Sequence, residues 1–193
     1  VANKLGAPTA RLEGRLSLNP LKHIDPFGSV VLPLFLLLSG SGFVFGWAKP
    51  VPVDERYFKR PTRDNLLVSS AGIAANILFA ALCGTCIRLL GRFDTNVLTM
   101  LLASFFFILM LVNLILAAFN LIPVPPLDGS KTFLGWIDKP WAQSYLHSPR
   151  SALLGIGIIF IALPLLFQAL GSENNPLTLW LRGFTETMIK MLL

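Results

Sequence analysis

The stretch VLTMLLASFFFILMLVNLILAAFNLIPVPPLDG, residues 97–129, decides how this chain folds. It carries no charge until Asp128, which follows three prolines and precedes a glycine. Its apolar part exceeds the roughly 20 residues that an α-helix needs to cross a hydrocarbon core, and prolines lack the backbone N–H that continues a helix. An ionisable group at a membrane span costs roughly 2.5–3.5 kcal/mol on insertion scales, which makes Asp128 a candidate functional residue.

The composition of the 193 residues is typical of a membrane protein. Hydrophobic residues make up 54% of the chain and charged residues only 13%, an excess of apolar side chains that points to this class. The net charge of +6 is explained by Lys and Arg in loops that flank membrane segments. Because these basic residues are spread over several loops rather than one face, no nucleic-acid partner is expected.

Four apolar stretches organise the chain. Three are predicted to cross a membrane as helices, namely Leu66–Leu90, Val97–Ile122 and Ala152–Leu170. The fourth, Gly28–Ala48, contains Pro33 and a run of alternating Ser and Gly at 39–42, which favours a break or a hairpin. The C-terminal stretch Leu177–Leu193 carries three charged residues and predicts an interfacial amphipathic helix rather than a span.

The distribution of Lys and Arg supports a hairpin at Gly28–Ala48. If this stretch crosses the membrane, each side holds eight basic residues; if it enters and returns, one side holds 12 and the other four. The positive-inside rule favours the asymmetric arrangement. We therefore predict a re-entrant or hairpin element, with residues 48–65 and Asp128 on the cytoplasmic side.

The first residues have strand character. Polar and apolar residues alternate from Ala10 to Leu18 around Gly14, a pattern that favours a short β-hairpin over an exposed loop. The predicted fold class is an all-α polytopic membrane protein with about three to four transmembrane helices and a small β-hairpin or re-entrant element near the N-terminus. We expect one membrane-embedded domain, residues 1–193, made of a hairpin region (1–65), core helices (66–136) and C-terminal helices (137–193).

Asp128 has two interpretations. A carboxylate oxygen is a common zinc ligand, and a catalytic zinc has three protein ligands and a water. The alternative is a carboxylate that caps a helix through the backbone of residues 129–132. Asn113 and Asn120 lie seven residues apart, hence on one helix face; they either serve the site or join helices by hydrogen bonds.

Other polar residues have structural alternatives as well. Gly72 belongs to a run of small residues and predicts close helix packing, whereas Asn76 could face a cavity. His23 lies beside Asp25 and is either a metal ligand or a loop histidine held by hydrogen bonds, the second being favoured. Cys83 and Cys86 form a C-x-x-C inside an apolar helix, where packing is expected rather than redox chemistry.

Five segments in order resemble the site-2 protease family of intramembrane zinc metalloproteases, in its compact bacterial branch without a PDZ domain. The matching segments are Val1–Ala10, Gly14–Pro26, Gly46–Val53, the Ala71-Gly72-x-x-x-Asn76 stretch and Asn120–Gly129. The resemblance implies a peptidase that cleaves membrane-embedded or signal-peptide-like segments in the bacterial inner membrane, with lipids and such protein substrates as partners.

The resemblance also implies the site. The family binds Zn²⁺ through two His of a His-Glu-x-x-His helix and the Asp of a Leu-Asp-Gly motif, and the Glu activates the water on zinc. Asp128 would be the third zinc ligand. Asn120, Asn76 and Pro123 are the residues we expect to bind the substrate.

The sequence departs from the family in one large respect. The 193 residues contain no His-Glu-x-x-His, so two zinc ligands and the catalytic Glu are missing. We expect an incomplete chain that is inactive by itself. Two alternatives remain, a non-catalytic membrane-binding relative and a transporter with a broken helix, although the second predicts a pseudo-repeat that the sequence does not show.

Overall fold

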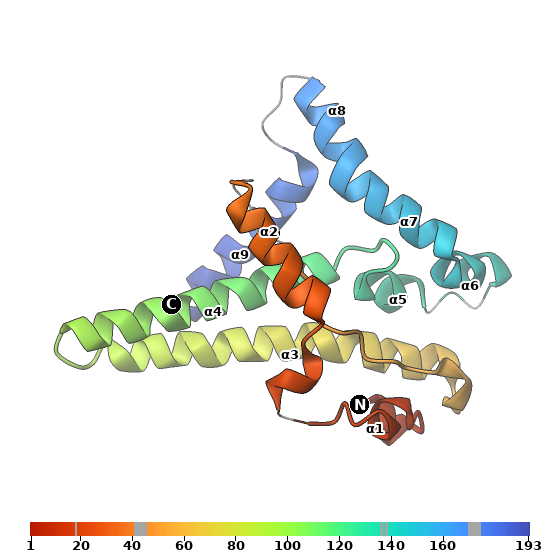
Figure 1. Ribbon diagram of the computed structural model, residues 1–193, viewed down its shortest axis with the longest axis horizontal. Coiled ribbons are helices and arrows are strands. Elements are labelled where there is room, and N and C mark those ends of the chain that lie inside the picture. Colours follow the sequence, from red (N-terminus) through yellow and green to blue (C-terminus); the bar gives the residue numbers. More distant parts are fainter. Residues whose placement is uncertain (18, 41–45, 136, 138, 170–174) are drawn as a thin grey trace. The chain divides into compact units, whose positions relative to one another are not determined.

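The computed structural model describes residues 1–17, 19–40, 46–135, 137, 139–169 and 175–193 (Figure 1). Within these residues the secondary structure is helical, and no strand occurs. The chain divides into two compact units, Val1–Asp64 and Asn65–Leu193. The predicted all-α class is therefore confirmed for the described part of the chain.

The first unit is built from short helices. They are η1 (Ala2–Leu5), α1 (Thr9–Leu12), η2 (Pro20–His23), η3 (Pro26–Val31), α2 (Leu32–Leu38) and η4 (Glu55–Tyr57).

The predicted β-hairpin at residues 10–18 is wrong for the residues that the structure describes there. Thr9–Leu12 forms one helical turn, in which the Leu12 N–H donates to the Pro8 carbonyl (2.9 Å). Gly14 then adopts a left-handed φ of +65°, and the Arg15 N–H donates to the Ala10 carbonyl (2.8 Å). This is a helix ending with a left-handed glycine, so the glycine that suggested a hairpin turn closes a helix instead.

The apolar stretch Gly28–Ala48 returns to where it starts. Its first half is helical through η3 and α2, which end at Leu38, and Gly40 follows with a φ of +67°. Beyond the undescribed residues 41–45, the Trp47 N–H donates to the Gly28 carbonyl (3.0 Å), and the Ser29 hydroxyl donates to the Trp47 carbonyl (2.8 Å). The two ends therefore lie side by side, as in a hairpin; the entry of this element into a membrane stays a prediction.

The longest helices are α3 (Pro61–Leu90) and α4 (Val97–Asn120). The second unit contains α4 and all of α3 from Asn65 onward. Each is long and apolar enough to cross a membrane, and they are the two such helices in the described residues, which fits a membrane protein. The side-chain oxygen of Asn96 accepts from the Thr99 N–H (2.9 Å), and the Thr99 hydroxyl accepts from the Asn96 N–H (2.9 Å). This capping box fixes the start of α4.

The third predicted span, Ala152–Leu170, is helical over its described residues. It comprises α7 (Pro149–Gly157), a π-helical turn η5 (Ile158–Ala162) and α8 (Leu163–Ala169), which follow one another without a break. The wider turn precedes Pro164, whose ring would clash with the carbonyl four residues earlier in a regular α-helix. Whether this segment crosses a membrane stays a prediction.

The C-terminal helix α9 (Pro176–Leu192) packs against the pair α3 and α4. A buried cluster of Ala80, Cys83, Met110 and Leu114 joins the two long helices, and it contacts the apolar face of α9 through Phe184, Met188, Ile189 and Leu192. The charged residues of α9 face away, where Arg182 pairs with Glu186 (2.7 Å) on an exposed surface. Two further helices, α5 (Asp128–Leu134) and α6 (Pro140–His147), lie between α4 and α7 in the sequence.

Candidate functional site

The loop Leu121–Leu127 connects α4 to α5 and leads directly into Asp128. Two short-range backbone bonds fold it: the Val124 N–H donates to the Ile122 carbonyl (2.8 Å), and the Leu127 N–H donates to the Val124 carbonyl (3.0 Å). Pro125 is fully buried, and the peptide bond to Pro126 is cis. The prolines end α4, as predicted, and the folded loop sets where α5 begins.

Two glycines let the surrounding helices approach this loop. A Cβ on Gly129 would lie 2.5 Å from the carbonyl oxygens of Leu121 and Ile122, so the start of α5 rests directly on the first two residues of the loop. A Cβ on Gly155 would overlap the Pro125 carbonyl and lie 2.6 Å from Cγ1 of Val124. Helix α7 therefore contacts the loop with its backbone.

Asp128 is half-buried at the first position of α5 and faces α3. A Cβ on Gly72 would lie 3.3 Å from Oδ2 of Asp128, so the small residue of α3 makes room for the carboxylate. Burial raises the pKa of Asp128, and the nearby ammonium of Lys131 opposes this shift. Within the described residues no side-chain capping bond is seen at the start of α5, and the choice between a metal ligand and a helix-capping residue stays a prediction.

The predicted asparagines lie on α3 and α4. Asn76 is half-buried one turn beyond Gly72, on the same face and about 6 Å further along the helix. The side-chain amides of Asn113 and Asn120 donate within α4, to the carbonyls of Leu109 (2.8 Å) and Leu116 (3.0 Å). In both residues the side-chain oxygen takes no part in that bond. A role for Asn76 and Asn120 in substrate binding stays a prediction.

His23 lies in the first unit. Its Nε2 is 2.9 Å from the Ser17 carbonyl, and the ring is half-buried. His23 is the last residue of η2, and its role as a metal ligand stays a prediction.

The donors present do not by themselves fit a catalytic zinc ion. Such an ion takes three protein ligands, yet the described residues contain no group of three His, Cys, Asp or Glu side chains that could hold a metal. Near the Leu-Asp-Gly motif the structure offers the carboxylate of Asp128 as a ligand. A complete metal site therefore needs donors beyond those that the described residues bring together.

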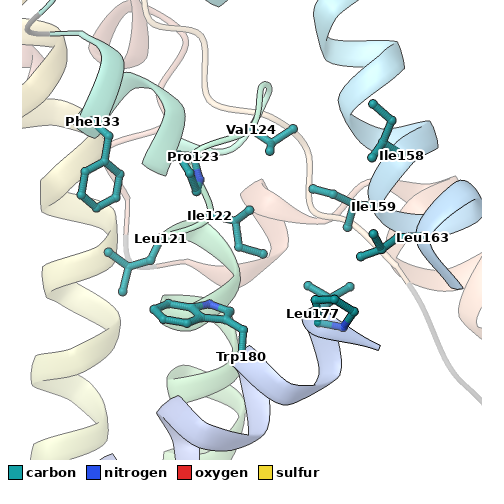
Figure 2. A pocket seen from close by; sticks show the side chains of 11 residues that line it. Leu121, Ile122, Pro123, Val124, Phe133, Ile158, Ile159, Leu163, Leu177 and Trp180 are labelled. Atoms are coloured by element: carbon teal, nitrogen blue, oxygen red, sulfur yellow. The ribbon is translucent and has the colours of Figure 1, made fainter. Parts of the chain in front are cut away.

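An apolar cavity of about 700 Å³ adjoins the loop (Figure 2). Its walls come from the loop, α5, the η5–α8 segment and α9, and they comprise Leu121, Ile122, Pro123, Val124, Phe133, Ile158, Ile159, Leu163, Pro176, Leu177 and Trp180. Of these residues, the sequence analysis had singled out only Pro123 for the site. Trp180 opens the repeat 180, 184, 188 and 192 of apolar residues on α9, a helical spacing that could have identified the packed face.

Comparison with known proteins identifies a protein family whose model matches this chain. Residues 45–164 match the model of peptidase family M50. A Bacillus subtilis (strain 168) protein described as "Putative zinc metalloprotease YwhC" is 42% identical over 132 residues, which cover 67% of this chain and 57% of that protein. The chain thus spans a little over half the length of this relative. No solved structure matches.

Proposed function

Because the chain belongs to peptidase family M50, the site-2 protease family, we propose that it forms part of an intramembrane zinc metalloendopeptidase. The observation that carries this proposal is the carboxylate of Asp128. It is half-buried, it faces Gly72 of a helix long enough to cross a membrane, and it follows a loop whose shape is fixed by close backbone contacts. A half-buried carboxylate is stabilised by nearby positive charge, and a metal ion would supply such charge in addition to that of Lys131.

Asp128 would supply one zinc ligand, and other segments would supply the rest. The 193 residues contain only two histidines, His23 and His147, and no His-Glu-x-x-His. We therefore propose that two His ligands and the catalytic Glu come from a segment outside these residues, so that this chain alone is inactive.

Residues around Asp128 would position the substrate. The Oδ1 of Asn120 takes no part in the bond that this side chain donates to its own helix, and it could accept from a substrate N–H. Asn76 lies one turn along α3 from the carboxylate's contact at Gly72. The proposed substrates are membrane-embedded or signal-peptide-like segments, and the proposed setting is a bacterial inner membrane crossed several times, with lipids around the chain and Asp128 at the cytoplasmic side.

The proposal is tested by supplying the missing donors. The chain is produced with and without an N-terminal His-Glu-x-x-His helix from a family member, and bound zinc and cleavage of a membrane peptide are measured. We expect both in the extended form, and the loss of both in its Asp128→Ala variant. The control is Asp94→Ala, which removes an exposed carboxylate. Full zinc content and cleavage in Asp128→Ala, or cleavage without the added helix, would refute the assignment.

The incomplete donor set also favours a second candidate, a membrane-binding relative without catalysis. This candidate predicts that the longest natural form of the protein neither retains zinc nor cleaves, although it still binds apolar peptides. Zinc analysis of that form separates the two functions.

A further inference from the structure

We propose that the apolar cavity beside the Asp128 loop is a subsite for a large apolar side chain of the substrate, within about three residues of the bond to be cleaved. The inference rests on the proposed function because that function supplies the peptide substrate. The cavity itself is a feature of the second unit alone (Figure 2).

The walls of the cavity select a hydrocarbon group. Among the described side chains that line it, the indole of Trp180 is the one hydrogen-bond donor, and its Nε1–H already donates to the Ala118 carbonyl (2.9 Å). A polar group that entered would lose its bonds to water and gain none from these side chains, at a cost of about 1–3 kcal/mol. The volume of about 700 Å³ lies within the usual range for ligand pockets of roughly 300–1,000 Å³, so a leucine or an aromatic side chain fits.

The cavity lies close to Asp128 along the chain. Val124, which lines it, accepts a hydrogen bond from the Leu127 N–H (3.0 Å). Such a turn brings its first and fourth Cα atoms to within about 7 Å, and the next Cα lies about 3.8 Å further on. The Cα atoms of Val124 and Asp128 are therefore within about 11 Å of each other. An extended peptide covers this distance in about three residues.

Close backbone contacts fix the position of the cavity walls relative to the loop that precedes the Asp128 carboxylate. Gly155 seats α7 on Val124 and Pro125, and Gly129 seats α5 on Leu121 and Ile122, in each case with no room for a Cβ. Three of these loop residues, Leu121, Ile122 and Val124, line the cavity. The η5–α8 segment that continues α7 also contributes three lining residues. A lipid chain would gain little from a fixed distance to Asp128, whereas a substrate side chain requires one. This continuity favours the peptide as the occupant.

Position-specific cross-linking tests the inference without requiring catalysis. The full chain, with Cys83 and Cys86 replaced by alanine, is reconstituted in lipid nanodiscs as Leu163→Cys or as Asp128→Cys. Each form is oxidised with a panel of synthetic Leu-rich transmembrane peptides that carry one cysteine at successive positions. We expect each variant to trap one or two peptide positions, and the two sets to differ by at most three residues. The control is Leu165→Cys, on the same helix but not lining the cavity, which should trap no preferred position.

Three results would overturn the subsite. They are equal yields at all peptide positions, a separation of more than three residues between the two sets, and a Leu165→Cys pattern that matches that of Leu163→Cys. The cross-linking is also repeated with an excess of peptide that lacks cysteine. If the yields are equal at all positions and this competitor does not reduce them, the cavity is assigned to lipid. None of these cross-linking measurements requires zinc. Failure of the proposed peptidase function is therefore detected separately, because the form with the added His-Glu-x-x-His helix would then neither bind zinc nor cleave the peptide.

A second measurement uses the extended, zinc-binding form. Leu163→Trp should narrow the cavity and lower kcat/KM for a substrate with leucine at the trapped position about tenfold or more, since one methylene in an apolar pocket changes this ratio roughly 10–200-fold. The Leu163→Trp enzyme should cleave a substrate with alanine at that position at an unchanged rate. The control Leu165→Trp should show the same preference between the leucine and alanine substrates as the enzyme without either substitution. An equal loss for both substrates would contradict a role in side-chain selection.

Discussion

The contact between α7 and the Asp128 loop predicts that Gly155→Ala destabilises the protein. The new Cβ would lie 2.6 Å from Cγ1 of Val124 and overlap the Pro125 carbonyl, whereas ordinary contacts begin at 3.4 Å. The contact with Val124 alone requires a separation of 0.8 Å (3.4 − 2.6 Å), and the closer contact with the Pro125 carbonyl requires more. That carbonyl is backbone, which cannot rotate away as a flexible side chain can. Overpacking of this kind costs about 1–3 kcal/mol.

Gly157→Ala is the matched control because it makes the same change in the same helix. A Cβ there has no atom within 4 Å, and both variants share the gain of up to about 1 kcal/mol from replacing glycine in a helix. The difference between the variants thus isolates the contact at Gly155. It corresponds to a Tm that is roughly 2–12 °C lower for Gly155→Ala in a protein of this size.

Thermal unfolding in detergent, followed by tryptophan fluorescence, measures this difference. Cross-linking from Leu163→Cys should also lose its position preference in Gly155→Ala, because the loop has moved. If Gly155→Ala unfolds at the same temperature as Gly157→Ala, α7 does not rest on the loop, and the argument that the cavity and Asp128 form one piece fails with it.

Two further predictions concern other contacts. Gly72→Ala brings a Cβ to 3.3 Å from Oδ2 of Asp128, so the carboxylate must shift by a few tenths of an ångström, and zinc retention in the extended form should weaken several-fold; zinc titration measures it. Arg15→Ala removes a buried guanidinium that donates to the Lys22 and Pro50 carbonyls, which should cost about 1–3 kcal/mol and speed proteolysis within residues 16–24.

Each of these predictions has a control in the same unit. Gly183→Ala, where a Cβ meets nothing within 4 Å, should leave zinc retention unchanged, and an equal loss in both glycine variants would rule out a specific contact with Asp128. Arg11→Ala removes an exposed arginine and should leave the proteolysis rate as it is. A proteolysis rate in Arg15→Ala equal to that of Arg11→Ala would show that the guanidinium does not stabilise the backbone at Lys22 and Pro50.

The sequence was sufficient to predict those helices whose formation is decided by one strong physical effect, the burial of a long apolar run. The apolar runs at 66–90 and 97–122 predicted the two longest helices, because some 20 consecutive apolar residues leave few alternatives. Residues 10–18 were misread because a nine-residue alternation is a weak signal. There, the backbone bond from Arg15 to Ala10 and the left-handed Gly14 close a helical turn, and such local bonds outweigh a pattern with no partner strand.

The candidate site could be predicted in its chemistry but not in its geometry. The sequence identified Asp128 as a candidate ligand and Gly72 as a packing residue, yet it could not show that the glycine packs against the carboxylate. The cavity escaped prediction as well, since its walls come from four segments between Leu121 and Trp180. Contacts at such separations depend on how the helices associate, which periodicity within one helix does not determine.

The position of Asp128 is set by packing and by the backbone hydrogen bonds of the loop before it. Gly129 and Gly155 fix the loop through steric contacts, and no metal-ligating side chain takes part in them. A ligand that is already in place costs little to organise when its metal arrives, and this is the property that effective sites require. It follows that the loop should keep its shape when the other donors are absent, so the peptide positions trapped by Leu163→Cys should be the same with and without the added His-Glu-x-x-His helix. If that pattern appears only when the helix and zinc are present, the metal organises the loop, and the glycine contacts are a consequence of the site rather than its cause.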